Sequence, residues 1–350
     1  MTSLIRFRAL CSLSLKRLAI STSTALLGTL VCPPLALAQA SQVGFERLRV
    51  PLEAGEVAQG GVWFPSSGAT QSQQMGLWST DLVPTGPVVG RGLGLVVLSH
   101  GSGGHFTSHF DTAMALARAG FVVAALNHPG DNALDGSLQG TKQLLEARPR
   151  QLSSLIDHML KSWRGSSAIA PGRIGAFGFS AGGHAVLVSI GAQPDYMTLA
   201  SHCQGQTQEP LCRILGAQAF VLSGATPSAG DPRIKAAVVA APAMGFAIPA
   251  KNVHELVVPL QVWAASLDDL VPYEANVQPW VETQSPSFTT KVVRGAGHMS
   301  FLPACSPGRP DSNPAIAEVC TDPPGFDRRQ FKEEFNREVV QHFQNALPRR

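Results

Sequence analysis

Short apolar runs alternate with helical patterns along the middle of the chain. Buried strands are predicted at residues 93–99, 121–126, 173–180, 234–241, 260–265 and 289–293. Helices are predicted between them, for example at residues 110–120 and 181–190. Strands that alternate with helices form a mostly parallel sheet covered on both faces, so the predicted fold class is α/β.

The two ends of the chain predict further elements. Residues 45–50 and 60–65 predict short antiparallel strands at one edge of the sheet. Residues 65–92 are rich in Ser, Gly, Gln and Pro, which predicts a long surface loop. Apolar side chains at helical spacing between Phe331 and Phe343 predict an amphipathic final helix.

The first forty residues have the pattern of a secretory signal peptide. A basic start is followed by the apolar stretch Leu18–Val31 and by "ALAQA" at residues 36–40, which offers small residues for cleavage. The alternative is a membrane anchor, but the apolar stretch is short and Ser and Thr interrupt it. We therefore predict a signal peptide at 1–40, a domain at 41–350, a periplasmic or secreted protein and no stable membrane insertion.

Charge argues against a nucleic-acid partner. The formal net charge of the 350 residues is +3. The segment 1–40 holds four basic and no acidic residues, so its removal leaves the mature chain at −1. No basic field then remains to attract a polyanion.

Metal binding is not predicted either. No H-E-x-x-H motif is present, and His105 and His109, four residues apart, have no third ligand at a recognisable spacing. We expect no metal and no other cofactor.

Four cysteines remain after removal of the signal segment: Cys203, Cys212, Cys305 and Cys320. An even number in an exported protein favours disulfides over free thiols. Proximity along the chain favours Cys203–Cys212 and Cys305–Cys320, which is one of three possible pairings.

Polar residues follow four of the predicted strands. "SHGSGG" occupies 99–104, Ser180 lies in "GFSAGG", Asp268 and Asp269 follow residues 260–265, and His298 follows residues 289–293. The carboxyl ends of parallel strands meet at one edge of the sheet, so these side chains are expected to converge. G-x-S-x-G between a strand and a helix is the nucleophile-elbow pattern, and the order serine, acid, histidine is that of an α/β-hydrolase.

The chain resembles the serine α/β-hydrolases, and more closely the branch that contains predicted dienelactone hydrolases and platelet-activating-factor-acetylhydrolase-like proteins. "LSHGSGG", "NHPGDN", "GFSAGG", "DDLVP" and "GAGHMSF" carry the resemblance, over roughly residues 93–301. The resemblance implies an α/β-hydrolase fold. Dienelactone hydrolases proper use a cysteine nucleophile, whereas this elbow has Ser180, so their lactone substrate is not carried over.

The residue types suggest a Ser-His-Asp triad. Ser180 is the predicted nucleophile, and His298 is the base that takes its proton. The spacing D-x-x-V-P, where related families place the acid, favours Asp268 as the residue that orients His298, and Asp269 remains the alternative. Two backbone amides would stabilise the oxyanion.

One of those amides is predicted next to the nucleophile, at Ala181. The resemblance places the other at Ser102 rather than Gly103. The long connection at residues 191–233 predicts a lid-like insertion at the catalytic edge.

The predicted function is hydrolysis of a small-molecule or lipid carboxylic ester through an acyl-enzyme. Two alternatives stay open from the sequence. One is an amidase or peptidase of the same fold, and the other is a non-catalytic binding protein. An idle protein would be expected to lose a triad member, and all three residue types are present.

Overall fold

The computed structural model describes residues 42–205, 210–215, 230–281, 288–306 and 313–349. The predicted signal peptide at 1–40 lies outside these residues, and so do parts of the predicted insertion at 191–233. Among the described residues, no helix is both long enough and apolar enough to cross a bilayer.

Ten strands of the described chain form one sheet in the order β10-β9-β8-β7-β5-β6-β2-β1-β4-β3. Its parallel part consists of β5 (Leu93–Ser99), β6 (Phe121–Leu126), β7 (Ile169–Phe179), β8 (Ile234–Ala240), β9 (Leu260–Ala265) and β10 (Phe288–Val293). These strands match the predicted series. Their carboxyl ends point to the same edge of the sheet, where the predicted site residues follow them.

The antiparallel edge of the sheet is larger than predicted. It contains β1 (Gln42–Pro51), β2 (Val57–Ser66), β3 (Gln71–Met75) and β4 (Trp78–Pro84), which pair antiparallel except for a short parallel contact between β1 and β4. The prediction of a loop over 65–92 is therefore wrong, because β3 and β4 form a hairpin there. Most side chains of β3 are polar and exposed, and the strand is defined by its backbone pairing with β4. Such a strand has little hydrophobic pattern that the sequence could reveal.

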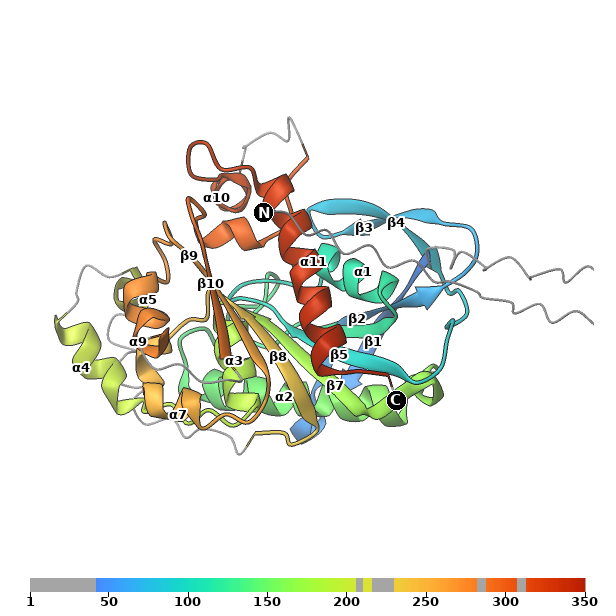
Figure 1. Cartoon of the computed structure of the whole chain (residues 1–350), viewed down its shortest axis with the longest axis horizontal. Helices are drawn as coiled ribbons and strands as arrows, with labels where there is room; N and C mark the ends of the chain where they lie inside the picture. The colour runs from blue at the N-terminus through green and yellow to red at the C-terminus, as the bar shows by residue number, and fades with distance from the viewer. Residues whose placement is uncertain (1–41, 206–209, 216–229, 282–287, 307–312, 350) are drawn as a thin grey trace, which may run out of the picture. The chain divides into compact units, whose positions relative to one another are not determined.

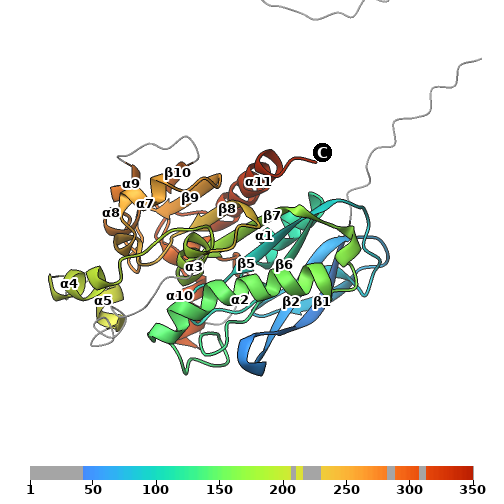
Figure 2. The ribbon, with the colours of Figure 1, turned by 90° about the horizontal axis from the view of Figure 1, so that it is seen from below.

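Helices cover both faces of the sheet (Figures 1 and 2). α1 (Phe110–Arg118) and α11 (Arg328–Ala346) lie on one face, and α2 (Lys142–Lys161) and α3 (Ala181–Ser189) lie on the other. The predicted α/β class, with a mostly parallel sheet between helices, is confirmed.

Alternation along the strands divides the core in two. In β5, Leu95 and Val97 belong to the cluster under α2 and α3, whereas Val96 and Leu98 belong to the cluster under α1 and α11. Successive side chains of a strand point to opposite faces, so a strand between two helical layers must be apolar at every position. This explains the unbroken run "LGLVVLS".

Shorter helices and 3-10 turns complete the described chain, and several of them lie at the carboxyl edge of the sheet. They are α4 (Met197–Gly205), α5 (Pro210–Leu215), α7 (Ala250–His254), α8 (Tyr273–Asn276), α9 (Gln278–Val281), α10 (Pro314–Cys320) and the 3-10 turns η1 (Glu53–Gly55), η2 (Ser166–Ala168), η3 (Gly245–Ala247) and η4 (His298–Phe301). The start of α4 is tied to α3, because the Tyr196 hydroxyl lies 2.8 Å from His184 Nε2.

Two disulfides join elements near this edge. Cys203 in α4 is bonded to Cys212 in α5, and Cys305 is bonded to Cys320 at the end of α10. Both are the pairings that proximity along the chain favours.

We expect removal of the Cys305–Cys320 bond by a double serine substitution to lower the free energy of unfolding by about 3 kcal/mol, the chain-entropy value for a loop of its length. The bond spans a separation of 15 residues. Urea unfolding measures the loss, and a reductant, which breaks both disulfides, should lower the stability of the wild-type chain by at least as much. Serine at Cys203 and Cys212, which are 9 residues apart, is the matched control with a shorter loop. Equal stability of the Cys305/Cys320 double variant and the wild type would contradict the expectation.

Candidate active site

Ser180 occupies a sharp turn between β7 and α3. Its backbone has φ 54° and ψ −120°, a conformation that a residue with a side chain seldom adopts. The turn is held from β8 and the segment after it: the Ser180 amide donates to the Ala240 carbonyl at 3.0 Å, and the Ser180 carbonyl accepts from the Ala243 amide at 3.1 Å. The strained conformation presents the hydroxyl beyond the strand end.

The glycines on either side of Ser180 are required by space. A Cβ at Gly178 would lie 2.2 Å from the carbonyl oxygen of Gly182, and a Cβ at Gly182 would lie 2.0 Å from the carbonyl oxygen of Ser99. Such distances exclude any side chain without movement of the backbone. The G-x-S-x-G pattern therefore reports the close approach of α3 to the ends of β5 and β7.

His298 and Asp268 form a buried pair at the ends of β10 and β9. His298 Nδ1 lies 2.8 Å from Asp268 Oδ2, and both side chains are almost fully excluded from solvent. A carboxylate can only accept, so Nδ1 carries the proton and donates it. Nε2 is then the unprotonated nitrogen in the neutral ring.

The turn after β9 buries one of the two candidate acids and exposes the other. Asp268 is 7% exposed, and its Oδ1 accepts from the amides of Leu270 at 3.0 Å and Val271 at 2.7 Å. Asp269 is exposed. The carboxylate that contacts His298 is therefore that of Asp268, and three hydrogen bonds hold it in place.

A second set of contacts holds the turn that carries His298. Ser300 Oγ accepts from the Gly297 amide at 3.1 Å and donates to Asp322 Oδ1 at 2.7 Å. Asp322 is in turn bound by Arg328 Nε at 2.9 Å, at the start of α11. The ring of Phe179, the residue before Ser180, lies 4.8 Å from the His298 ring between centroids.

The loop after β5 approaches Ser180 from the other side. The amide of Gly103 donates to Asp131 Oδ1 at 2.8 Å, so it is already occupied. Within the described chain, no residue accepts a hydrogen bond from the amides of Ser102 or Ala181. Ala181 is the first residue of α3, where helical amides lack an intrahelical acceptor.

Two buried histidines brace this loop in their neutral form. His100 Nε2 accepts from the His128 amide at 3.2 Å, so Nδ1 carries the proton and donates to the Gly101 carbonyl at 2.7 Å. Burial, and then the nearby Arg148 guanidinium, lower the pKa of His100 to about 3. Burial likewise lowers the pKa of His128 well below its ordinary value.

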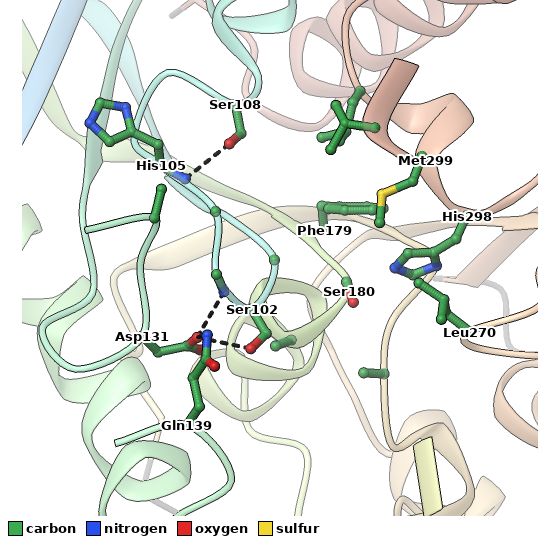
Figure 3. A pocket seen from close by; sticks show the side chains of 18 of the residues that line it. Ser102, His105, Ser108, Asp131, Gln139, Phe179, Ser180, Leu270, His298 and Met299 are labelled. Carbon is green, nitrogen blue, oxygen red and sulfur yellow. Dashed lines mark hydrogen bonds between the residues drawn. The ribbon is translucent and has the colours of Figure 1, made fainter. Parts of the chain in front are cut away.

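Ser180 and His298 face a single cavity of about 840 Å³. In the view of Figure 3, Ser180 lies between Ser102 on one side and His298 on the other. Most of the wall is apolar, and its described apolar side chains include Leu77, Trp78, Leu134, Leu144, Leu145, Phe179, Leu211, Met244, Leu270, Val271, Met299, Leu302, Ile316 and Val319. The cavity suits a ligand with a large apolar group.

The cavity wall carries little charge. Among its described residues there is no Lys or Arg, and the carboxylate present, Asp131, is bound by Arg148 at 2.6 Å. The predicted insertion at 191–233 forms part of the cavity wall, because α5 places Leu211 there. Trp78 is also on the wall, and its Nε1 donates to the Ala304 carbonyl at 3.2 Å.

The described residues contain no group of three or more His, Cys, Asp or Glu side chains placed to hold a metal ion. His105 and His109, which were considered as metal ligands from the sequence, each contact other groups. His105 Nδ1 lies 2.8 Å from Thr107 Oγ1, and His109 is buried against the rings of Phe177 and Phe179.

No place in the site was predicted from the sequence for Asp131 and Arg148, which bind the loop after β5, or for Gln139, which binds Asp131. Asp131 lies in "NHPGDN", directly after a predicted strand, and that position was an available signal. Arg148 lies in the interior of α2, where nothing in the local pattern distinguishes it from a surface arginine.

The chain matches no protein-family model and no curated protein sequence. Among solved structures it is similar to a ferulic acid esterase from Streptomyces cinnamoneus, with a TM-score of 0.57 and 16% sequence identity. The match covers 89% of this chain and 92% of the esterase. The likeness extends over the whole fold and agrees with the α/β-hydrolase architecture expected from the sequence.

The neutral buried histidines predict a pH-dependent stability. Between His100's ordinary pKa of 6.5 and its lowered value of about 3, the unfolded chain binds a proton that the folded chain does not. The free energy of unfolding should therefore fall as the pH is lowered through this window, by about 1.4 kcal/mol per pH unit for each such histidine.

Urea unfolding at pH 6, 5.5 and 5 tests this expectation. His100→Gln should reduce the slope by about the share of one histidine, whatever its effect on stability at pH 7. A slope equal to that of the wild type would contradict a neutral His100 in the folded state.

Proposed function

We propose that this protein is a serine hydrolase that cleaves carboxylic esters through an acyl-enzyme. The observation that carries the proposal is one arrangement. Ser180, on a strained turn, shares a cavity with His298, whose Nδ1 is bound to the buried carboxylate of Asp268. A serine hydroxyl is a weak nucleophile unless a base takes its proton, and a base is useful only when its tautomer is held.

The reaction follows from these roles. Ser180 Oγ attacks the ester carbonyl carbon while His298 Nε2 takes the hydroxyl proton. Asp268 stabilises the imidazolium that forms. The imidazolium then protonates the leaving alkoxide, which departs as an alcohol and leaves the acyl group on Ser180. Water, deprotonated by the same histidine, attacks the acyl-enzyme, and Ser180 leaves with the returned proton.

The tetrahedral intermediates carry negative charge on the former carbonyl oxygen. We propose that the amides of Ala181 and Ser102 stabilise it, because both residues line the cavity with Ser180 and neither amide has an acceptor among the residues that the structure describes. Preorganised donors act strongly where water is excluded, and removal of one typically costs about 10²–10³ in kcat. The occupied amide of Gly103 supports the choice of Ser102.

The cavity supports a neutral ester with an apolar acyl or alcohol group as substrate. Burial of apolar surface contributes about 25 cal/mol per Å², which a wall rich in leucine and methionine can supply. A carboxylate or phosphate on the buried part of a substrate would find no cation among the described residues of the wall. A small apolar ester and a lipid ester both meet these requirements.

Ester hydrolysis as the reaction class is also supported by the fold-level likeness to a ferulic acid esterase. Membership of the branch with dienelactone hydrolases and platelet-activating-factor-acetylhydrolase-like proteins rests on the sequence motifs. Two disulfides support export to the periplasm or the medium, since such bonds persist in oxidising compartments.

The nucleophile can be tested by covalent labelling. A fluorophosphonate should label the wild-type chain once, at Ser180, and Ser180→Ala should abolish both the label and turnover of p-nitrophenyl esters from acetate to decanoate. His298→Ala should lose about six orders of magnitude in kcat, because triad members act as a unit.

Two controls sharpen this experiment. Ser189→Ala, at the far end of α3, should keep the label. Matching p-nitroanilides should be cleaved far more slowly than the esters, and faster cleavage would favour the amidase alternative. Stoichiometric labelling of Ser180→Ala would contradict the assignment of the nucleophile.

The acid can be tested by a matched pair of isosteric variants. Asp268→Asn removes the charge that holds the His298 tautomer and should lower kcat by about 10⁴. Asp269→Asn changes an exposed neighbour and should lower kcat by about tenfold or less. Steady-state kinetics on one ester compares the two, and a larger loss at Asp269 would reverse the assignment.

A further inference from the structure

The loop that carries the proposed Ser102 donor has no regular secondary structure of its own. Residues 100–104 follow the end of β5 and precede α1. We propose that the buried ion pair between Arg148 and Asp131 positions this loop and so sets the direction of the Ser102 amide. The inference deepens the proposed ester hydrolysis and rests on it. Both residues are positioning residues, without a chemical step of their own.

Asp131 holds the second half of the loop. Its Oδ1 accepts from the Ser102 hydroxyl at 2.8 Å, from the Gly103 amide at 2.8 Å and from Gln139 Nε2 at 3.0 Å. Its Oδ2 accepts from Arg148 at 2.6 Å, and the side chain is 0% exposed. One carboxylate therefore binds two consecutive residues of the loop.

Arg148 holds the first half. One of its terminal nitrogens donates to the His100 carbonyl at 2.7 Å, and the other lies 3.5 Å from the Gly101 carbonyl as well as 2.6 Å from Asp131. The arginine comes from α2 and the aspartate from the segment after β6, so the loop is bound to two other elements of the fold.

Together the two side chains form hydrogen bonds with the polar groups around Ser102 but not with the Ser102 amide. The carbonyls of His100 and Gly101 face the guanidinium, and the Ser102 hydroxyl and the Gly103 amide face the carboxylate. No acceptor for the Ser102 amide exists among the residues that the structure describes. The arrangement leaves that donor free for an oxygen in the cavity.

The charge state suits this role. Burial alone would raise the pKa of Asp131, but Arg148 and the donors at Gly103, Ser102 and Gln139 outweigh it and lower the pKa. The carboxylate stays ionised near neutral pH and keeps all its acceptor sites. A buried ion pair adds little net stability compared with apolar side chains, so we assign its role to the geometry that it imposes on the loop.

This role predicts a particular kinetic signature. A displaced Ser102 amide weakens binding of the oxyanion in the transition state more than binding of the neutral ester. Loss of the ion pair should therefore lower kcat and leave KM nearly unchanged. It should also weaken inhibition by a trifluoromethyl ketone, because this compound forms a charged tetrahedral adduct with a serine.

The experiment compares Arg148→Lys, Asp131→Asn and a control, Asp231→Asn. A lysine keeps Asp131 paired but lacks the planar fork that reaches several acceptors. Asp231 makes a similar pair with Arg233, at 2.6 Å, away from the cavity. Each variant is tested with p-nitrophenyl butyrate, the trifluoromethyl ketone, a fluorophosphonate and thermal unfolding.

We expect Arg148→Lys to lower kcat about tenfold and Asp131→Asn about 10²–10³-fold, up to the value for loss of a whole oxyanion donor. KM should change less than threefold, and inhibition by the ketone should weaken in parallel with kcat. Asp231→Asn should lower the melting temperature and keep kcat. If Asp131→Asn does not fold, Arg148→Lys and the ketone decide the question.

Unchanged kcat and ketone affinity in Arg148→Lys, with an active wild type labelled at Ser180, would overturn this inference alone. A rise in KM with kcat preserved would also overturn it, since it would indicate a role in substrate binding. A wild-type chain that neither hydrolyses esters nor labels at Ser180 would overturn the proposed function, and this inference with it.

Discussion

The close approach of α3 to the ends of β5 and β7 is the constraint on which the site depends. The carbonyl oxygens of Gly182 and Ser99 lie where side chains at residues 178 and 182 would be, so only glycine allows this approach on either side of the left-handed Ser180. The helix can therefore begin directly at the strand end. The same contact brings the loop after β5 beside Ser180.

The buried carboxylates near this turn lie beside a largely apolar cavity, and each is bound by other groups of the protein. Asp268 binds His298 and two backbone amides, and Asp131 binds Arg148 and the loop after β5. The neutral His100 completes the second network. An unpaired charge in such surroundings would be costly. The hydrogen bonds that pair these groups also fix the loops, and with them the directions of the backbone amides that face the cavity.

Both disulfides lie next to helices that form the cavity wall. α5, bonded to α4 through Cys212, contributes Leu211, and α10, which ends at Cys320, contributes Ile316 and Val319. These helices are short and cannot be stable by themselves. Covalent links thus support the part of the wall that the sheet does not hold.

Local pattern was sufficient for much of this protein. Unbroken apolar runs report strands buried on both faces, and the two glycines around Ser180 report a close backbone approach, because both effects act within a few residues. Strand β3 left no such pattern, since its backbone pairing with β4 places no demand on polar, exposed side chains. The sequence by itself therefore determined the parallel sheet and the order of Ser180, the acidic pair and His298.

Only the tertiary structure decided how the loops are held. Whether Asp268 or Asp269 meets His298 depends on which carboxylate the turn after β9 buries. The pairing of Arg148 with Asp131 joins residues from a helix and a distant loop, and no local periodicity encodes that contact. Short-range preferences set the elements, whereas the partners of buried charges follow from how those elements pack.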